Sequence, residues 1–274
     1  MTECGLTGKC IEGTGPELVR AACVIAMSHR HLLYCLFLIG TIPTEFGLLS
    51  NLQWTPLFQN QLTGTIPTEI GPLESLWVIS ISSNQLTGPI PSQIGLLPSL
   101  FALDLANNDL TGALPTEIGQ LSDTIALSIH IGNNSISGPL PTELGLLTLL
   151  QKMSFQSNQF SGSIPSELAL LSHMRWMELK NNNYLTGQIP SELGALQQSL
   201  HTFSLEGNPM LSGTIPKALC AIIRTCISST LVVACPEKDG LTFDCPVSNH
   251  TTEALCGCDC ACTVPPLNVS QFTV

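Results

Sequence analysis

Residues 76–97 read LWVISISSNQLTGPIPSQIGLL, and this stretch is the key to the fold. Apolar and polar side chains alternate in its first part, so Ile79 and Ile81 are predicted to point inward from a short strand whose other side chains point outward. Asn84 then turns the chain, because its short amide satisfies backbone groups that the curve leaves unpaired. Pro91 fits the first position of a short helix. The stretch therefore predicts one strand, one turn and one short helix.

The same phrase recurs along the chain at intervals of 24 to 26 residues. Its Gly-x-Ile/Leu-Pro part places prolines at Pro43, Pro67, Pro91, Pro115, Pro141, Pro165, Pro190 and Pro216. An asparagine recurs in step at Asn60, Asn84, Asn108, Asn134, Asn158, Asn182 and Asn208. Apolar residues stand three and five positions before each asparagine, with Thr55 as the exception. Since one coil cannot bury its apolar residues alone, we predict an α/β solenoid, a right-handed superhelix with a parallel concave sheet and short convex helices.

These coils follow the pattern Leu-x-x-Leu-x-Leu-x-x-Asn-x-Leu, which identifies residues 40–219 as about seven to eight leucine-rich repeats. Their suffix Leu-Thr-Gly-x-Ile-Pro-x-Glu-Ile/Leu-Gly, as in residues 62–71, resembles the plant-type extracellular subclass. That subclass is found in receptor-like kinase ectodomains, receptor-like proteins and polygalacturonase-inhibiting proteins. The resemblance implies a receptor-like, non-catalytic recognition module that binds a protein, peptide or polysaccharide on its concave face. It also allows an inhibitor of a secreted wall-degrading hydrolase.

The twelve cysteines all lie outside the regular repeats, four in the first 35 residues and eight from Cys220 onward. They mark an irregular N-terminal segment or cap at residues 1–39 and a Cys-rich cap and tail at residues 220–274, on either side of the solenoid at residues 40–219. Disulfides of open pairing are expected among the C-terminal cysteines, which are Cys220, Cys226, Cys235, Cys245, Cys256, Cys258, Cys260 and Cys262. One-residue spacings between the last four do not fit structural zinc, so no metal is expected.

Glycosylation motifs of the form Asn-x-Ser/Thr occur at Asn133, Asn249 and Asn268. Together with the cysteines they favour a secretory route, so the protein is expected to be extracellular or on the cell surface. The first residues lack the charged-then-apolar order of a signal peptide. Apolar runs at residues 21–27 and 32–39 are each too short to span a bilayer. Residues 1–39 therefore have three possible interpretations: a cap on the solenoid, a membrane anchor formed by the two apolar runs together, or an incorrect N-terminus.

Composition and motifs argue against several classes of function. The net charge of −11 comes from 20 acidic and 9 basic residues without a run of Lys or Arg, which disfavours nucleic acid and anionic membrane as partners. The sequence has no Gly-x-Ser-x-Gly, no His-Glu-x-x-His and no phosphate-binding glycine loop, so neither an enzyme nor a cofactor is expected. The acid that recurs in the coils, as at Glu69 and Glu143, is interpreted as a helix-start charge on the convex side rather than a cation site.

Outward positions of the sheet lie six, four and two residues before each asparagine, and these are the predicted ligand contacts. The candidate binding residues are Trp54, Phe58, Asp104, His130, Lys152, Gln156, Trp176, Glu178, Lys180 and Glu206. Exposed aromatic rings on a rigid sheet are typical binding hot spots, and Trp176 is the favoured anchor. The alternative for Trp176 is packing on its own sheet. Trp54 and Phe58 alternatively cover the N-terminal segment, and His130 is either a pH-sensitive contact or a solvated polar residue.

A further alternative is an adhesion or matrix protein, including an ice-surface binder that uses a recurring hydroxyl residue. Threonine recurs after the turn at Thr63, Thr87, Thr111 and Thr186. Serine interrupts this array at Ser137, Ser161 and Ser212.

Overall fold

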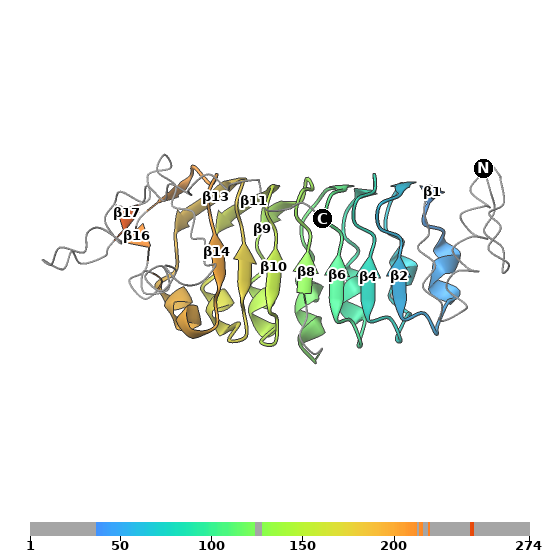
Figure 1. Cartoon of the computed structure of the whole chain (residues 1–274), viewed down its shortest axis with the longest axis horizontal. Helices are drawn as coiled ribbons and strands as arrows, with labels where there is room; N and C mark the ends of the chain where they lie inside the picture. The colour runs from blue at the N-terminus through green and yellow to red at the C-terminus, as the bar shows by residue number, and fades with distance from the viewer. Residues whose placement is uncertain (1–36, 124–127, 213, 216–218, 220–241, 244–274) are drawn as a thin grey trace, which may run out of the picture.

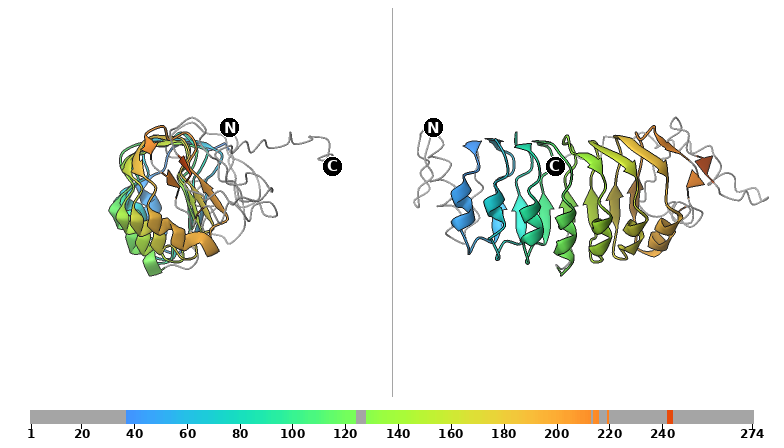
Figure 2. Two further views of the ribbon diagram at one scale, coloured as in Figure 1. Left: turned by 90° about the vertical axis from the view of Figure 1, so that its left-hand side faces the viewer. Right: turned by 180° about the vertical axis from the view of Figure 1, so that it is seen from behind.

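The computed structural model describes residues 37–123, 128–212, 214–215, 219 and 242–243. The expectations for residues 1–36, for the C-terminal cysteines and for the motifs at Asn249 and Asn268 lie outside the described residues. Within them the predicted solenoid is confirmed, because successive coils stack into one elongated body (Figure 1). Seen end on, the helices gather on one side of the coils and the strands on the others (Figure 2).

One parallel sheet of seven strands, here called the concave sheet, runs along the described solenoid. In spatial order its strands are β2 (Trp54–Pro56), β4 (Val78–Ser80), β6 (Ala102–Asp104), β8 (Ser128–His130), β10 (Lys152–Ser154), β12 (Trp176–Glu178) and β14 (Thr202–Ser204). The middle residue of every strand is buried, as the alternation predicts. Thr55, the exception in the repeat, is also buried, and its hydroxyl accepts a hydrogen bond from Ser80 N at 2.9 Å. A polar residue is tolerated there because its hydroxyl is paired.

Each coil carries a short 3-10 helix on the opposite, convex side. The helices described are η1 (Thr44–Leu48), η2 (Thr68–Ile70), η3 (Ser92–Leu96), η4 (Thr116–Asp123), η5 (Thr142–Leu146), η6 (Ser166–Leu170) and η7 (Ser191–Gln198). The prediction that Pro91 is the first helical residue is wrong by one position, since Pro91 is extended (φ −68°, ψ 135°) and η3 begins after it. The chain reaches the helix in an extended conformation, and Pro91 O accepts the first helical hydrogen bond from Ile94 N at 3.1 Å.

A second set of parallel strands, not predicted from the sequence, forms where the Leu-Thr-Gly part of one coil meets the next. These strands are β1 (Ile39–Thr41), β3 (Gln61–Thr63), β5 (Thr87–Gly88), β7 (Asp109–Leu110), β9 (Ser137–Pro139), β11 (Asn158–Ser163), β13 (Asn182–Gln188) and β15 (Leu211–Ser212). They pair as β1–β3, β5–β7 and β9–β11–β13–β15. Backbone hydrogen bonds between coils create the pairing, as where Thr87 N donates to Gly64 O at 2.7 Å. Two further short strands, β16 (Thr214–Ile215) and β17 (Thr242–Phe243), pair with each other.

The recurrent asparagines tie each turn to the coil before it, as predicted. Asn108 Nδ2 donates at 3.1 Å to Leu105 O in its own turn and at 3.1 Å to Ile81 O in the preceding coil. Its Oδ1 accepts from Leu86 N at 3.0 Å. The same three contacts recur at the other asparagines from Asn84 to Asn182. Asn208 keeps the two Nδ2 contacts, but its Oδ1 accepts from Asn182 N at 3.0 Å. The turns therefore enter an apolar interior with their backbone groups paired, and aliphatic side chains fill one continuous core around them.

Candidate ligand-binding site on the concave sheet

The three outward columns predicted from the sequence run straight across the coils, in register. The first column holds Trp54, Val78, Ala102, Ser128, Lys152, Trp176 and Thr202. The second holds Pro56, Ser80, Asp104, His130, Ser154, Glu178 and Ser204. The third lies just past the strands, kept in step by backbone hydrogen bonds between coils, and holds Phe58, Ser82, Ala106, Gly132, Gln156, Lys180 and Glu206. All ten candidate residues therefore lie on this one surface.

The two ends of this surface differ in chemistry. Towards the N-terminus, Trp54 and Phe58 are half-buried, so only part of the predicted aromatic patch is accessible. Towards the C-terminus, Lys180 Nζ lies 3.7 Å from Glu206 Oε1, and both side chains are partly exposed. Such an exposed ion pair contributes little to stability, about 0–1 kcal/mol, so its charges stay available to a ligand. The surface thus changes from aromatic to charged along the solenoid.

Trp176 both packs on the sheet and remains accessible. Its side chain is 36% exposed, and its ring stacks on His201 of the next coil with centroids 5.9 Å and planes 25° apart. His201 Nδ1 lies 2.7 Å from Ser199 O. Because a carbonyl oxygen only accepts hydrogen bonds, this nitrogen carries a proton, and the bond fixes the imidazole. Trp176 and His201 together form an aromatic platform near the C-terminal end of the sheet.

Three buried polar side-chain atoms in the described part of the chain have no hydrogen-bond partner, and all three lie in the outward columns of this surface. They are His130 Nε2, Gln156 Oε1 and Glu206 Oε2. The Gln156 amide lies over Gly132, where an added Cβ would meet it at 2.6 Å, so the small residue makes room for this side chain. An unpaired buried polar atom costs about 1–3 kcal/mol, which a ligand that supplies the missing partner recovers. Unsatisfied hydrogen-bonding capacity is therefore concentrated on this surface.

His130 lies in the middle column between charged neighbours. Burial lowers the pKa of its imidazole, Lys152 lowers it further, and Asp104 and Glu178 oppose these effects. Asp104 also accepts a hydrogen bond from Ser82 Oγ at 2.7 Å. The neutral imidazole is therefore favoured at neutral pH, which is consistent with a ring nitrogen that is buried and unpaired.

We expect the lowered His130 pKa to make the protein less stable as the pH falls below 6.5, the ordinary histidine value. In that window the unfolded chain takes up a proton that the folded chain resists, whereas at higher pH both states are neutral. Urea unfolding of wild type and His130→Gln between about pH 7.5 and pH 5 checks this, and the variant should lose less stability on acidification. Identical pH dependence in the two proteins would contradict the assignment.

A fourth outward column, seven residues before each asparagine, was missed from the sequence. Its described members are Gln53, Trp77, Phe101, Gln151, Arg175 and His201. Trp77 is 49% and Phe101 40% exposed, and their rings lie 6.3 Å apart. The Leu-x-x-Leu part of the repeat could have predicted this column, because two residues separate buried Leu76 from buried Ile79. Both intervening positions face outward because the chain becomes a strand only at the second of them.

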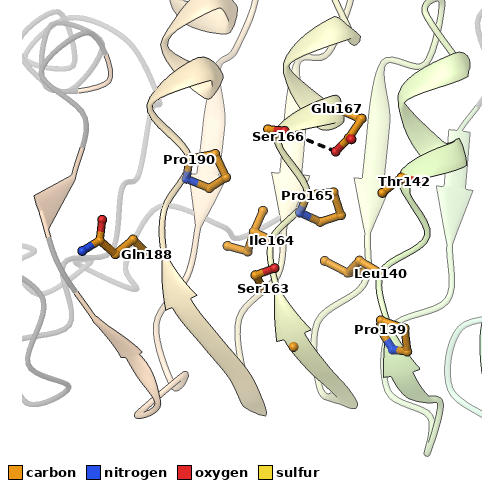
Figure 3. A pocket seen from close by; sticks show the side chains of 11 residues that line it. Pro139, Leu140, Thr142, Ser163, Ile164, Pro165, Ser166, Glu167, Gln188 and Pro190 are labelled. Carbon is orange, nitrogen blue, oxygen red and sulfur yellow. Dashed lines mark hydrogen bonds between the residues drawn. The ribbon is translucent and has the colours of Figure 1, made fainter.

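The recurrent acids lie in the first turns of the convex helices, as predicted, at Glu45, Glu69, Glu117, Glu143, Glu167 and Glu192. Two hollows also lie away from the concave sheet. One, of about 590 Å³, is lined by Pro139, Pro165 and Glu167 among others, where the second strands run into the helices (Figure 3). The other, of about 460 Å³, lies between η4 and η5. Neither hollow includes a candidate residue of the concave sheet.

Asn133, the glycosylation motif within the described chain, is exposed, and its Nδ2 donates to Asn107 Oδ1 at 2.9 Å. Among the described residues there is no group of three side chains suited to a metal ion. The same residues include no helix with the length and apolar character that a bilayer crossing requires.

The family model described as Leucine Rich Repeat matches residues 75–97 and 99–121. The ectodomain of the Arabidopsis thaliana receptor kinase GASSHO1/SCHENGEN3, solved with CASPARIAN STRIP INTEGRITY FACTOR 2, is 33% identical, with a TM-score of 0.66 over 76% of this chain. The Arabidopsis receptor kinase HAESA, solved with the peptide hormone IDA and the co-receptor SERK1, is 31% identical, with a TM-score of 0.66 over 76% of this chain. A plant ice-binding protein is 25% identical, with a TM-score of 0.51 over 79% of this chain and 73% of its own.

The repeat, the parallel sheet and the family match show that the chain is a leucine-rich-repeat protein. Within that class its solenoid has the architecture of plant receptor kinase ectodomains. The chain spans 25% of the length of the GASSHO1/SCHENGEN3 ectodomain and 33% of that of HAESA. No curated protein matches the sequence.

Proposed function

We propose that this protein is a receptor-like, non-catalytic recognition module that binds an extended protein, peptide or polysaccharide chain across its concave sheet. The proposal is carried by the unpaired buried polar atoms of the described residues, which all lie in the outward columns of this surface. The exposed platform of Trp176 and His201 supports it, because accessible aromatic rings on a rigid surface are typical hot spots. The similarity to ectodomains such as HAESA, solved with a peptide hormone, supports the same use of the fold and an extracellular or cell-surface location.

The dimensions of the sheet suit an extended ligand. Adjacent strands are about 4.8 Å apart, so seven strands span roughly 30 Å, the length of about eight or nine extended peptide residues. The central coils present Ala102, Ser128 and Gly132 outward. These short side chains let a ligand approach the backbone, while larger groups at both ends of the sheet provide contacts.

Two experiments with the full chain test this proposal. In one, the chain selects ligands from a random peptide display library, and in the other its binding to immobilised wall polysaccharides is measured. We expect Trp176→Ala to weaken the selected ligands by at least about 2 kcal/mol, or roughly 30-fold, because it removes an anchor ring. The matched control Glu69→Ala/Glu143→Ala changes only convex residues and should alter affinity by less than about 0.5 kcal/mol. Circular dichroism of each variant separates lost binding from lost folding. Ligands that depend on the convex residues and not on Trp176 would overturn the proposal.

Binding to an ice surface is a second candidate, favoured by a hydroxyl residue that recurs once per coil at the second set of strands and by the plant ice-binding protein among the similar structures. These residues are Thr63, Thr87, Thr111, Ser137, Ser161, Thr186 and Ser212, and they are offset from one another in the strand register, since Thr87 pairs with Asp109 and Ser137 with Gln159. The hydroxyls of Thr63 and Thr87 each lie 3.3 Å from a glycine carbonyl of the preceding coil, which fixes their side chains. In an ice-recrystallisation assay, Thr87→Glu/Thr111→Glu should abolish inhibition while Trp176→Ala retains it. An inactive wild-type protein would exclude this candidate.

A further inference from the structure

The basic side chains of the described solenoid are gathered in one place. All three that these residues contain, Lys152, Arg175 and Lys180, belong to two neighbouring coils and border the concave sheet. The acidic side chains are instead distributed along the whole solenoid, from Glu45 in η1 to Glu206 beyond β14. In a chain with a net charge of −11, this grouping concentrates the described basic side chains in two coils, with Glu178 and Glu206 as their acidic neighbours on the same surface.

Two of these three cations have no ion-pair partner among the described residues. Lys180 is paired with Glu206 at 3.7 Å, whereas Lys152 and Arg175 form no such contact. Both lie in what we call the rim strip, which consists of Gln151, Lys152, Arg175, Trp176, His201 and Thr202. Backbone hydrogen bonds hold the strip together, since Arg175 N donates to Gln151 O at 2.8 Å and His201 N to Arg175 O at 2.7 Å. The strip contains no acidic residue.

The aromatic platform occupies the centre of the same strip. Trp176 is the register partner of Lys152 on one side and of Thr202 on the other. Arg175 directly precedes it and is also exposed. A flat ring is thus flanked by two cations that have no ion-pair partner within the described part of the chain. The amide of Gln151 and the hydroxyl of Thr202 lie beside it, and each can hydrogen-bond a polar ligand.

From this arrangement we propose that the rim strip binds a linear anionic polysaccharide, an assignment that rests on the proposed function of the concave sheet. Its carboxylate or sulfate groups pair with Lys152 and Arg175, and the apolar face of one sugar ring lies on Trp176. An acidic peptide carries the same charges without a sugar ring, so it is the alternative occupant that the binding experiment must separate from a polysaccharide.

Biolayer interferometry of the full chain against immobilised polysaccharides tests the proposal. We expect binding to polygalacturonate, to dextran sulfate or to both, and no binding to neutral dextran. Comparison of the first two polymers distinguishes recognition of carboxylate groups from recognition of sulfate groups. Because the contacts are ionic, affinity should fall as salt rises. Lys152→Gln/Arg175→Gln should weaken binding by at least about 10-fold, and Trp176→Ala by a similar factor.

A charge-matched control separates local contacts from the overall charge. Gln93→Glu/Gln120→Glu makes the net charge more negative by the same two units but acts on the convex helices, and it should reduce affinity by less than about 2-fold. Equal losses in the two double variants would overturn the assignment, as would equal binding to poly-glutamate, which carries the charge without sugar rings. Failure to bind either polysaccharide would also overturn it. The peptide selection on the same surface would still decide the proposed function independently.

Discussion

Replacing Asn182 by leucine is expected to lower the free energy of unfolding by about 3–5 kcal/mol. The asparagine is 0% exposed, and its amide pairs three buried backbone groups. Nδ2 donates to Leu179 O at 2.9 Å and to Phe155 O at 3.1 Å, and Oδ1 accepts from Phe160 N at 3.3 Å. Leucine has nearly the same size but offers neither donor nor acceptor, so each of these groups is left unpaired in the core. Urea unfolding followed by circular dichroism measures the loss.

The neighbouring Asn183 provides the control, because the same substitution there changes an exposed side chain. Asn183→Leu should alter stability by less than about 0.5 kcal/mol. Hydrogen exchange should place the damage of Asn182→Leu in the coils on either side of β13, since each repeat contacts only its neighbours. A loss below about 1 kcal/mol would mean that water reaches the turn and replaces the amide.

Phe160→Ala is expected to cost about 3–5 kcal/mol, through lost burial and the cavity it leaves. Phe160 belongs to β11 in the second set of strands, while Phe155 directly follows β10 of the concave sheet. Both are 0% exposed, and their rings stack with centroids 5.7 Å apart. The pair therefore fills the space between the two strand layers of this coil, and removing one ring leaves the other without its partner. Equilibrium unfolding of the full chain gives the change in stability.

Phe160→Leu is the matched control, because leucine occupies the same repeat position at Leu62, Leu86, Leu110 and Leu185. It keeps most of the apolar volume and should cost less than about 1.5 kcal/mol. If the leucine variant were as unstable as the alanine variant, the ring stack itself, rather than the filled volume, would be the stabilising feature.

The spacing of the repeat was enough to predict the concave sheet and its three main columns. In a stack of parallel coils each residue meets its equivalent one coil later, so a residue such as Trp176 could be placed beside Lys152 from periodicity alone. The asparagine turns were predictable for the same reason, since a buried turn needs a side chain that pairs its backbone. Most of the candidate surface therefore follows from local sequence. Its role in binding stays a prediction.

Only the tertiary structure decided the second strands, the position of the prolines relative to the helices and the composition of the rim strip. The Leu-Thr-Gly segment is too short to identify a strand by alternation, and its hydrogen bonds join it to another coil, as where Thr87 N donates to Gly64 O. Arg175 and His201 lie 26 residues apart in the sequence, yet the stacking of coils brings their backbones into direct hydrogen bonding. The sequence has no run of basic residues, but the solenoid assembles cations from separate coils because its neighbours in space are one repeat apart in the chain.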